Sequence, residues 1–259
     1  MKKSSVLIQT RLGSTRLPNK VLKIIEGKTA IWHVINRVKK IDSVDQIALI
    51  TTNKPEDRIL LKIAEENGII GFSGSEFDVL DRHFQCAKEI EADPIIRITS
   101  DCTLIDPFLS EKILRYYLSH DYDFVSNTIT PTFPDGLDTE IFSYESLEKA
   151  AYETKLPSER EHVTTYFIKN PDKFKISNYE NDVNLSNLRW TLDREQDLRF
   201  IQEIYSRMKP KTIFSMNEIL QILSSNPELL KINNGINRNE GHQESLEKDK
   251  NFLKKYNFS

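Results

Sequence analysis

Short apolar runs alternate with amphipathic, helix-spaced patterns through the first half of the chain. The apolar runs predict four strands, at residues 6–9, 46–51, 69–72 and 95–99. Apolar side chains at i, i+3, i+4 and i+7 predict a helix over residues 30–40. Further helices are expected from Pro55 to just before Gly68, around residues 80–87, and over residues 107–119. This order indicates βαβ units and a mostly parallel sheet with helices on both faces.

The second half departs from this alternation after Asp123. A turn at residues 134–136, a strand at 137–142 and helices at 143–154 and 158–169 are expected there. Together they predict an excursion, residues 123–179, that covers a site at the sheet edge. The chain should then return through a strand at 188–192 and a helix with Leu198 and Met208 on its apolar face.

The C-terminal residues 210–259 are expected to form a helical appendage to a core domain of residues 1–209. One helix start is clear, because Ser215 and Glu218 have the spacing of a capping box. Beyond Lys231 the chain becomes polar and charged, which is typical of a peripheral appendage or a partly mobile tail.

Composition narrows the classes of function. The chain has 259 residues, a net charge of -3 and 29% charged residues, so its overall charge does not favour nucleic-acid binding. No apolar run approaches the roughly 18 residues of a membrane-spanning helix, and we expect a cytoplasmic protein. Cys86 and Cys102 fit neither a zinc motif nor a disulfide framework, so both are expected to be reduced thiols.

The stretch from Gln9 to Lys20, QTRLGSTRLPNK, follows the first predicted strand directly. Gly13 would let the backbone approach a ligand closely. The loop also supplies two hydroxyl groups and three cations, from Ser14, Thr15, Arg11, Arg16 and Lys20. We therefore expect it to bind a polyphosphate at the carboxyl edge of the sheet. The stretch matches neither the P-loop nor the dinucleotide pattern, and the alternative is a solvated basic surface loop.

Two carboxylates are expected at the same edge of the sheet. Asp101 follows the run IIRITS, and Asp193 follows LRWTL. Carboxylates that meet from distant parts of a chain can hold Mg2+, with phosphates and waters completing its oxygen shell. The alternatives are that Asp193 caps the following helix and that Asp101 is a turn residue before Asp106 and Pro107.

Specific segments occur in order along the chain. They are QTRLGSTRLPNKVL (9–22), TTNKPED (51–57), GSEFDVLDR (74–82), RITSDCTLIDP (97–107), PDGLDTEIFS (134–143), LPSEREHVT (156–164) and LRWTLDREQDL (188–198). As a set they resemble the cytidylyltransferases that activate acidic sugars, and most closely the spore-coat-polysaccharide-type branch. The resemblance implies a glycosyltransferase-A-like (Rossmann-like) three-layer α/β sandwich, CTP as substrate, a Mg2+ requirement and a homodimer.

The resemblance also assigns roles to residues. It implies that Arg11, Ser14 and Lys20 face the triphosphate. Gly74, Ser75 and Arg82 would lie near the cytidine, and Asp101 and Asp193 would bind the metal. We expect Gln9 and Gly13 of the same loop in the nucleotide site as well. Ser100 stands before Asp101, where better-understood members have Gly, and the sugar-pocket motifs do not align with SEREHVT.

The acceptor is expected to bind under the excursion. Arg160 could pair bidentately with an acceptor carboxylate, while Glu161, His162, Asp135 and Asp138 could bind hydroxyl groups. The alternatives are a solvated helix face for residues 159–162 and ordinary turn chemistry for the two aspartates beside Gly136.

The reaction implied is CTP plus a sugar acid, giving a CMP-sugar and pyrophosphate for surface polysaccharide synthesis. A sugar hydroxyl would attack the α-phosphorus in line, and the catalytic residues would be Arg11, Lys20, Asp101 and Asp193. One alternative is a glycosyltransferase of similar fold that uses a sugar nucleotide, although the D-x-D motif of such enzymes is absent around Asp101, where the chain reads Asp-Cys-Thr. Another is a non-catalytic nucleotide-binding subunit.

Overall fold

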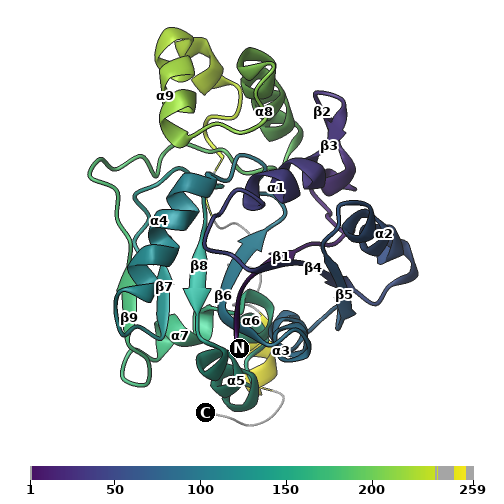
Figure 1. The fold of residues 1–259 in the computed structure, drawn as a ribbon, viewed down its shortest axis with the longest axis vertical. Coiled ribbons are helices and arrows are strands. Elements are labelled where there is room, and N and C mark those ends of the chain that lie inside the picture. The colour runs from purple at the N-terminus through teal and green to yellow at the C-terminus, as the bar shows by residue number, and fades with distance from the viewer. Residues whose placement is uncertain (1, 237, 239–247, 255–259) are drawn as a thin grey trace.

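A seven-stranded sheet forms the centre of the molecule (Figure 1). The computed structural model describes residues 2–236, 238 and 248–254. In spatial order the strands are β5 (Ile70–Gly74), β4 (Gln46–Thr52), β1 (Lys3–Gln9), β6 (Ala92–Thr99), β8 (Glu140–Phe142), β7 (Phe124–Ser126) and β9 (Ile176–Asn178). Neighbours are parallel except for β8, which is antiparallel to both β6 and β7. The strands expected in the first half are confirmed as β1, β4, β5 and β6.

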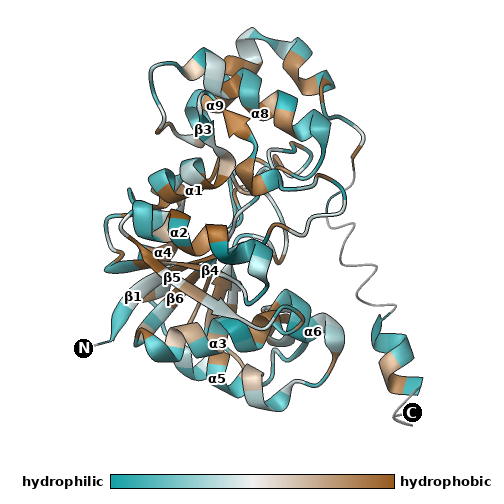
Figure 2. Ribbon diagram, turned by 90° about the vertical axis from the view of Figure 1, so that its right-hand side faces the viewer, coloured by the Kyte–Doolittle hydropathy of each residue, from teal (hydrophilic) through white to brown (hydrophobic). Residues whose placement is uncertain are grey.

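Side chains alternate across the central strands and build an apolar core on each face. In β1, Val6 and Ile8 belong to one core, whereas Leu7 belongs to the other. The first core is covered by α1 (Ala30–Val38), α2 (Arg58–Glu66), α4 (Pro107–Leu118), α8 (Glu195–Met208) and α9 (Met216–Ser225). The opposite face carries α3 (Val79–Glu89), α5 (Tyr144–Glu153), α6 (Pro157–His162) and α7 (Thr165–Lys169). Figure 2 shows α3, α5 and α6 on this face. The expected three-layer α/β sandwich is confirmed.

Local signals explain where several helices begin. Pro107 opens α4 after Asp106, whose carboxylate accepts hydrogen bonds from the backbone of Phe108 at 2.9 Å. The capping box expected at the start of α9 is present, because Ser215 and Glu218 bond each other's backbone. Short 3₁₀ turns are η1 (Lys20–Leu22), η2 (Pro55–Asp57) and η3 (Pro227–Lys231). Within the described residues, no helix combines the length and apolar character needed to cross a bilayer.

Expectations for the second half are partly wrong. Residues 188–192 form no strand and make an isolated bridge between Arg189 and Asp135. The helix expected at 158–169 is two helices, because Val163 between α6 and α7 has a φ of 55°, outside the helical region. The strand expected at 137–142 is reduced to β8. Strand β9 and the hairpin of β2 (Ile24–Ile25) and β3 (Lys28–Thr29) were not expected from the sequence.

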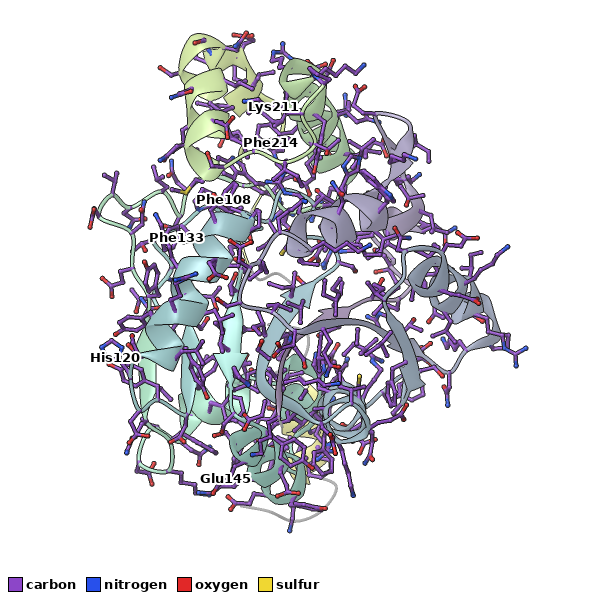
Figure 3. The ribbon with its side chains drawn as sticks, viewed as in Figure 1. Phe108, His120, Phe133, Glu145, Lys211 and Phe214 are labelled. Carbon is purple, nitrogen blue, oxygen red and sulfur yellow. The ribbon has the colours of Figure 1, made fainter. Side chains whose placement is uncertain are left out.

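A buried arginine ties the C-terminal helices to α1. Arg37 donates hydrogen bonds to the carbonyl oxygens of Ile105 (2.6 Å), Thr212 (3.0 Å) and Phe214 (2.5 Å). Its guanidinium also lies 4.3 Å from the centre of the Phe214 ring, in the segment between α8 and α9 (Figure 3). Because a buried guanidinium needs several acceptors, these contacts fix the segment against the sheet domain.

Some residues beyond α9 reach the sheet domain. Arg238 donates a hydrogen bond to Asp138 at 2.8 Å, and Asp249 accepts one from the backbone of Ser158 at 2.8 Å. Asn233 is also buried. These residues therefore contact the sheet domain directly. The division of the chain into a core domain and an appendage after residue 209 stays a prediction.

Candidate active site

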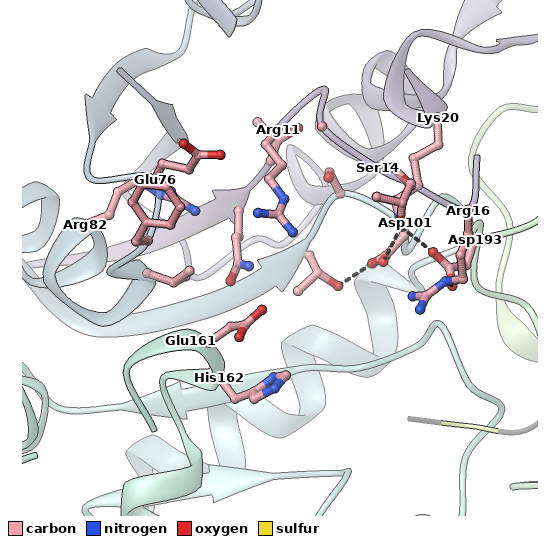
Figure 4. Close-up of a pocket in the computed structure, with 18 of the residues that line it drawn as sticks. Arg11, Ser14, Arg16, Lys20, Glu76, Arg82, Asp101, Glu161, His162 and Asp193 are labelled. Carbon is pink, nitrogen blue, oxygen red and sulfur yellow. Dashed lines mark hydrogen bonds and ion pairs between the residues drawn. The ribbon is translucent and has the colours of Figure 1, made fainter. Parts of the chain in front are cut away.

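The basic loop after β1 lines a pocket of about 480 Å³ at the carboxyl edge of the sheet (Figure 4). We call it the nucleotide pocket. The loop residues expected to bind nucleotide all line it: Gln9, Arg11, Gly13, Ser14 and Lys20. Asp57 of η2 anchors the loop, because its buried carboxylate accepts a hydrogen bond from the backbone of Leu12 at 2.8 Å. The segment TTNKPED thus shapes the loop.

Arg82 of α3 closes one end of this pocket. The side chain is buried and donates a hydrogen bond to the carbonyl of Ser75 at 2.6 Å, while its Nε has no partner among the described residues. Burial, together with nearby Arg11, lowers the pKa of Arg82 to about 10. A Cβ on Gly74 would stand 3.1 Å from Cγ of Arg82, so glycine makes room for the aliphatic part of that side chain. Gly74 and Ser75 support Arg82 but do not line the pocket.

Asp101 and Asp193 converge on one cation. Lys20 Nζ lies 2.9 Å from Asp101 Oδ2 and 3.0 Å from Asp193 Oδ1. Arg16 Nε is 2.5 Å from the other oxygen of Asp193. Burial would raise the pKa of Asp101, but Lys20 and the Thr99 hydroxyl hold it below its usual value. Both carboxylates therefore face the nucleotide pocket in a strongly cationic setting.

Backbone contacts explain why the two aspartates meet. The backbone N–H of Leu192 donates to the carbonyl of Asp101 at 2.9 Å, so the segment before Asp193 is fastened to the end of β6. Asp197 in the first turn of α8 accepts the backbone N–H groups of Asp193 (3.1 Å) and Arg194 (2.9 Å). The N-cap position belongs to Arg194, and the carboxylate of Asp193 contacts Lys20 and Arg16. Helix capping is therefore not its role in this structure.

The carboxylate oxygens at the edge of the nucleotide pocket fit a divalent cation that is bound together with a substrate. Asp101 and Asp193 offer carboxylate oxygens that already approach one positive charge. Within the described residues, no cluster of three or more His, Cys, Asp or Glu side chains could hold a metal. A hard cation at this position would thus need phosphate oxygens and waters to complete its shell, as Mg2+ commonly does.

A second pocket, of about 410 Å³, adjoins the first, and we call it the acceptor pocket. Residues on both linings are Arg16, Arg97, Thr99, Asp101, His162 and Asp193. The distal wall, which the nucleotide pocket does not share, includes Asp135, Asp138, Glu140, Arg189 and Arg238. The paired carboxylates therefore stand where the two pockets join, so molecules in both could meet beside them.

A close backbone contact builds the distal wall. Gly136 has a φ of 104°, and a Cβ there would stand 2.6 Å from the backbone nitrogen of Thr191. The backbone of Trp190 donates to the carbonyl of Asp135 at 2.7 Å, and Arg189 pairs with the Asp135 carboxylate at 3.1 Å. The turn at residues 134–136 thus brings both acceptor-side aspartates to the segment that ends in Asp193.

The residues expected to bind the acceptor are only partly brought together. Asp135 and Asp138 line the acceptor pocket. His162 lines both pockets, and Glu161 lines the nucleotide pocket, where Figure 4 shows the two side chains. Arg160 lines neither pocket.

The contacts of Arg160 explain its position. Its guanidinium bonds Asp78 (2.6 Å) and the carbonyls of Ala151 (2.8 Å) and Thr154 (3.2 Å). On α6 this residue faces α3 and α5, so the expected contact with an acceptor carboxylate has no support in the structure.

Several residues that line the pockets were not predicted from the sequence. In the nucleotide pocket they include Glu76 and Phe77, and Phe77 is 86% exposed at the rim. In the acceptor pocket they are Arg97, Glu140, Arg189 and Arg238. Arg97 and Glu140 form an ion pair between β6 and β8. Each lies within or beside a segment of the resemblance except Arg238, for which no local signal existed.

A basic loop after β1 and paired carboxylates at the same sheet edge define the class of protein as a nucleotidyltransferase with a Rossmann-like fold. The chain belongs to the cytidylyltransferase family, whose model matches residues 5–245. The resemblance noted in the sequence is thereby confirmed.

Individual proteins agree with this assignment. The spore coat polysaccharide biosynthesis protein SpsF of Bacillus subtilis is 27% identical over 240 residues, or 86% of this chain and 94% of that protein. A cytidylyltransferase structure from Leptospira borgpetersenii matches with a TM-score of 0.86 and 32% identity, over 92% of this chain and 100% of that one. A CMP:2-keto-3-deoxy-manno-octonic acid synthetase complexed with CTP matches with a TM-score of 0.63 over 80% of this chain and 100% of its own, and at 16% identity it shows the fold alone.

Proposed function

We propose that the protein transfers CMP from CTP to a sugar acid and releases pyrophosphate, as a step in surface polysaccharide synthesis. The observation that carries this proposal is the junction of two pockets at Asp101 and Asp193. One pocket is long and basic, as a nucleoside triphosphate requires, and the other is rich in hydroxyl-binding side chains. The family and the name of the Bacillus subtilis relative support the same assignment.

CTP would lie along the nucleotide pocket with its base toward Arg82. The guanidinium is buried, one of its nitrogens has no described partner, and cytosine offers it carbonyl and ring-nitrogen acceptors. The triphosphate would follow the loop past Arg11 and Ser14 toward Lys20. This orientation places the α-phosphate beside the junction, where a hydroxyl in the acceptor pocket can approach it.

Asp101 and Asp193 would hold Mg2+, which when bound supplies positive charge to the phosphate oxygens. The protein's own part is positioning and electrostatics. The acceptor hydroxyl forms a new bond to the α-phosphorus, the bond to the bridging oxygen of pyrophosphate breaks, and the hydroxyl proton passes to solvent. Arg11 and Lys20 stabilise the charge that develops on the leaving pyrophosphate.

A glycosyltransferase remains the rival function. Its sugar-nucleotide donor would also place phosphates beside the paired carboxylates, but the acceptor would attack the anomeric carbon of the donor sugar and not a phosphorus atom. The sequence Asp101-Cys102-Thr103 does not supply the second carboxylate of a D-x-D site, and Asp193 provides it from a distant segment instead. This arrangement favours nucleotidyl transfer. We also expect a cytoplasmic homodimer, and light scattering of the purified protein would test the oligomeric state.

Pyrophosphate release tests the proposal. The protein is incubated with Mg2+, each of the four nucleoside triphosphates and a panel of sugar acids, and products are identified by mass spectrometry. We expect pyrophosphate and a CMP-sugar only when CTP and an acceptor are both present. A parallel incubation replaces the nucleoside triphosphate with a sugar nucleotide. Release of a nucleoside diphosphate there, with no CMP-sugar from any acceptor in the first incubation, would support the glycosyltransferase instead.

A further inference from the structure

The chain returns to the active site after α9. Lys248 pairs with Glu161 at 2.9 Å and lines the nucleotide pocket. Asp249 is buried and accepts two hydrogen bonds from Ser158, from its backbone at 2.8 Å and from its hydroxyl at 2.5 Å. Arg238 lies on the distal wall of the acceptor pocket. The described residues of this segment thus touch both pockets.

Arg238 makes the contacts with the greatest consequence for the acceptor. Its Nη2 lies 2.8 Å from Asp138 Oδ1, and its Nε lies 3.7 Å from Asp135 Oδ1. A third nitrogen donates to the carbonyl of Phe133 at 3.4 Å. With only 16% of its side chain exposed, Arg238 is part of the pocket wall.

Two other arginines of the acceptor pocket, Arg189 and Arg97, make no described contact with Asp138. Arg189 binds both oxygens of Asp197, at 2.9 and 3.0 Å, and also Asp135. Arg97 bonds Gln9 and Glu140. Among the hydrogen bonds described for the side chain of Asp138, the donor is Arg238.

We propose that Arg238 is a specificity-determining residue of the acceptor site, because its ion pair orients the carboxylate of Asp138 to accept hydrogen bonds from acceptor hydroxyls. The inference rests on the proposed function. Asp138 and Arg238 line the acceptor pocket and not the nucleotide pocket. The hydroxyls that they bind therefore belong to the acceptor, so this pair acts on acceptor choice and not on CTP.

Charge around Asp138 makes Arg238 necessary. Burial raises the pKa of Asp138 to about 7; Arg238 opposes this rise, while Asp135, Glu140 and Asp101 add to it. Arg97, Arg189 and His162 also line this pocket. Loss of Arg238 would raise the pKa further, so the carboxyl group would be protonated at neutral pH. Acceptor binding should weaken as pH falls through this pKa and recover as pH rises.

The test compares Arg238→Gln, Arg238→Lys and Asp138→Asn with the wild type. Michaelis constants for CTP and for a sugar-acid acceptor are measured separately from pH 6 to pH 9. For Arg238→Gln we expect the acceptor constant to rise about tenfold at pH 7, the typical effect of losing a charged contact, while the CTP constant changes less than about twofold. The acceptor defect should shrink toward pH 9, and Arg238→Lys should restore part of the function. In Asp138→Asn the acceptor constant should lose this pH dependence.

Arg207→Gln is the matched control, because Arg207 pairs with Glu203 within α8 and lines neither pocket. It should behave as the wild type. An unchanged acceptor constant in Arg238→Gln, an equal defect for CTP, or a defect independent of pH would each overturn the inference. A wild type that forms no CMP-sugar would instead overturn the proposed function, and the inference with it.

Discussion

The two pockets are built in different ways. The nucleotide pocket takes a large, contiguous group of its polar side chains from one loop, residues 9–20, which directly follows a buried strand. The acceptor pocket collects its polar groups from distant segments, at Asp138, His162, Arg189 and Arg238. The nucleotide pocket therefore depends largely on one local stretch of sequence, whereas the acceptor pocket depends on how remote segments pack. Nucleotide binding should accordingly be robust, and acceptor choice should respond to small changes in several places.

The junction itself should give the largest effect. Asp101→Asn and Asp193→Asn each remove a charge without changing volume, and each should lower turnover by about a hundredfold or more with the fold intact. Pyrophosphate release and thermal unfolding are the measurements. Asp121→Asn is the control, since that side chain is 93% exposed. Normal Mg2+-dependent turnover by Asp193→Asn would show that the paired-carboxylate site is wrong.

The second largest effect is expected at Gly136, whose backbone packs closely against Thr191 behind the acceptor pocket. Gly136→Ala should lower the free energy of unfolding by about 2–4 kcal/mol, because its φ of 104° is unfavourable for alanine and its Cβ would meet the backbone of Thr191. Chemical denaturation measures this loss. Gly13→Ala is a matched comparison, since a Cβ there meets nothing within 4 Å. Equal stability of the two variants would contradict the packing described here.

A substitution at Arg11 should distinguish binding of the triphosphate from binding of the rest of the nucleotide. Arg11→Ala removes one cation from the nucleotide pocket and should weaken CTP binding about tenfold, whereas CMP, which lacks the β- and γ-phosphates, should lose less than about threefold. Calorimetry with both nucleotides provides the comparison, with Arg207→Ala as the control. Equal losses of affinity for CTP and CMP would show that Arg11 does not contact the β- and γ-phosphates.

The smallest effect is expected at Arg160. Arg160→Lys should leave the Michaelis constants for CTP and acceptor within about twofold and lower the free energy of unfolding by about 1–2 kcal/mol, because the guanidinium joins α6 to Asp78 and to two carbonyls. Steady-state kinetics and denaturation measure the two effects. A large rise in the Michaelis constant for the acceptor alone would show that Arg160 contributes to the acceptor site after all.

The same contrast explains what the sequence could predict. Apolar runs define β1 and β6, and polar groups that directly follow a buried strand must emerge at its carboxyl end, so the loop at 9–20 and Asp101 were placed correctly at the sheet edge. Asp193 also reaches that edge, but for another reason. No strand precedes it, and a hydrogen bond from Leu192 to Asp101 holds it there.

Residues on the acceptor side could not be placed from local pattern alone. The orientation of Arg160 depends on how the short helix α6 docks on its neighbours, which spacing within one turn does not determine. Arg238 stands in a polar stretch without periodicity, and its position depends on the path of the chain after α9. Long-range contacts of this kind are set by packing, so they appear only in the folded structure.

An oxygen label tests the central claim most directly. The acceptor sugar acid carries ¹⁸O in its attacking hydroxyl, and the reaction with CTP and Mg2+ is followed by phosphorus NMR and mass spectrometry. Transfer of CMP at the junction of the pockets predicts that the label is retained in the bridge between sugar and phosphate, with pyrophosphate unlabelled. A CMP-sugar without the label, or label in pyrophosphate, would contradict attack by the acceptor hydroxyl on the α-phosphorus.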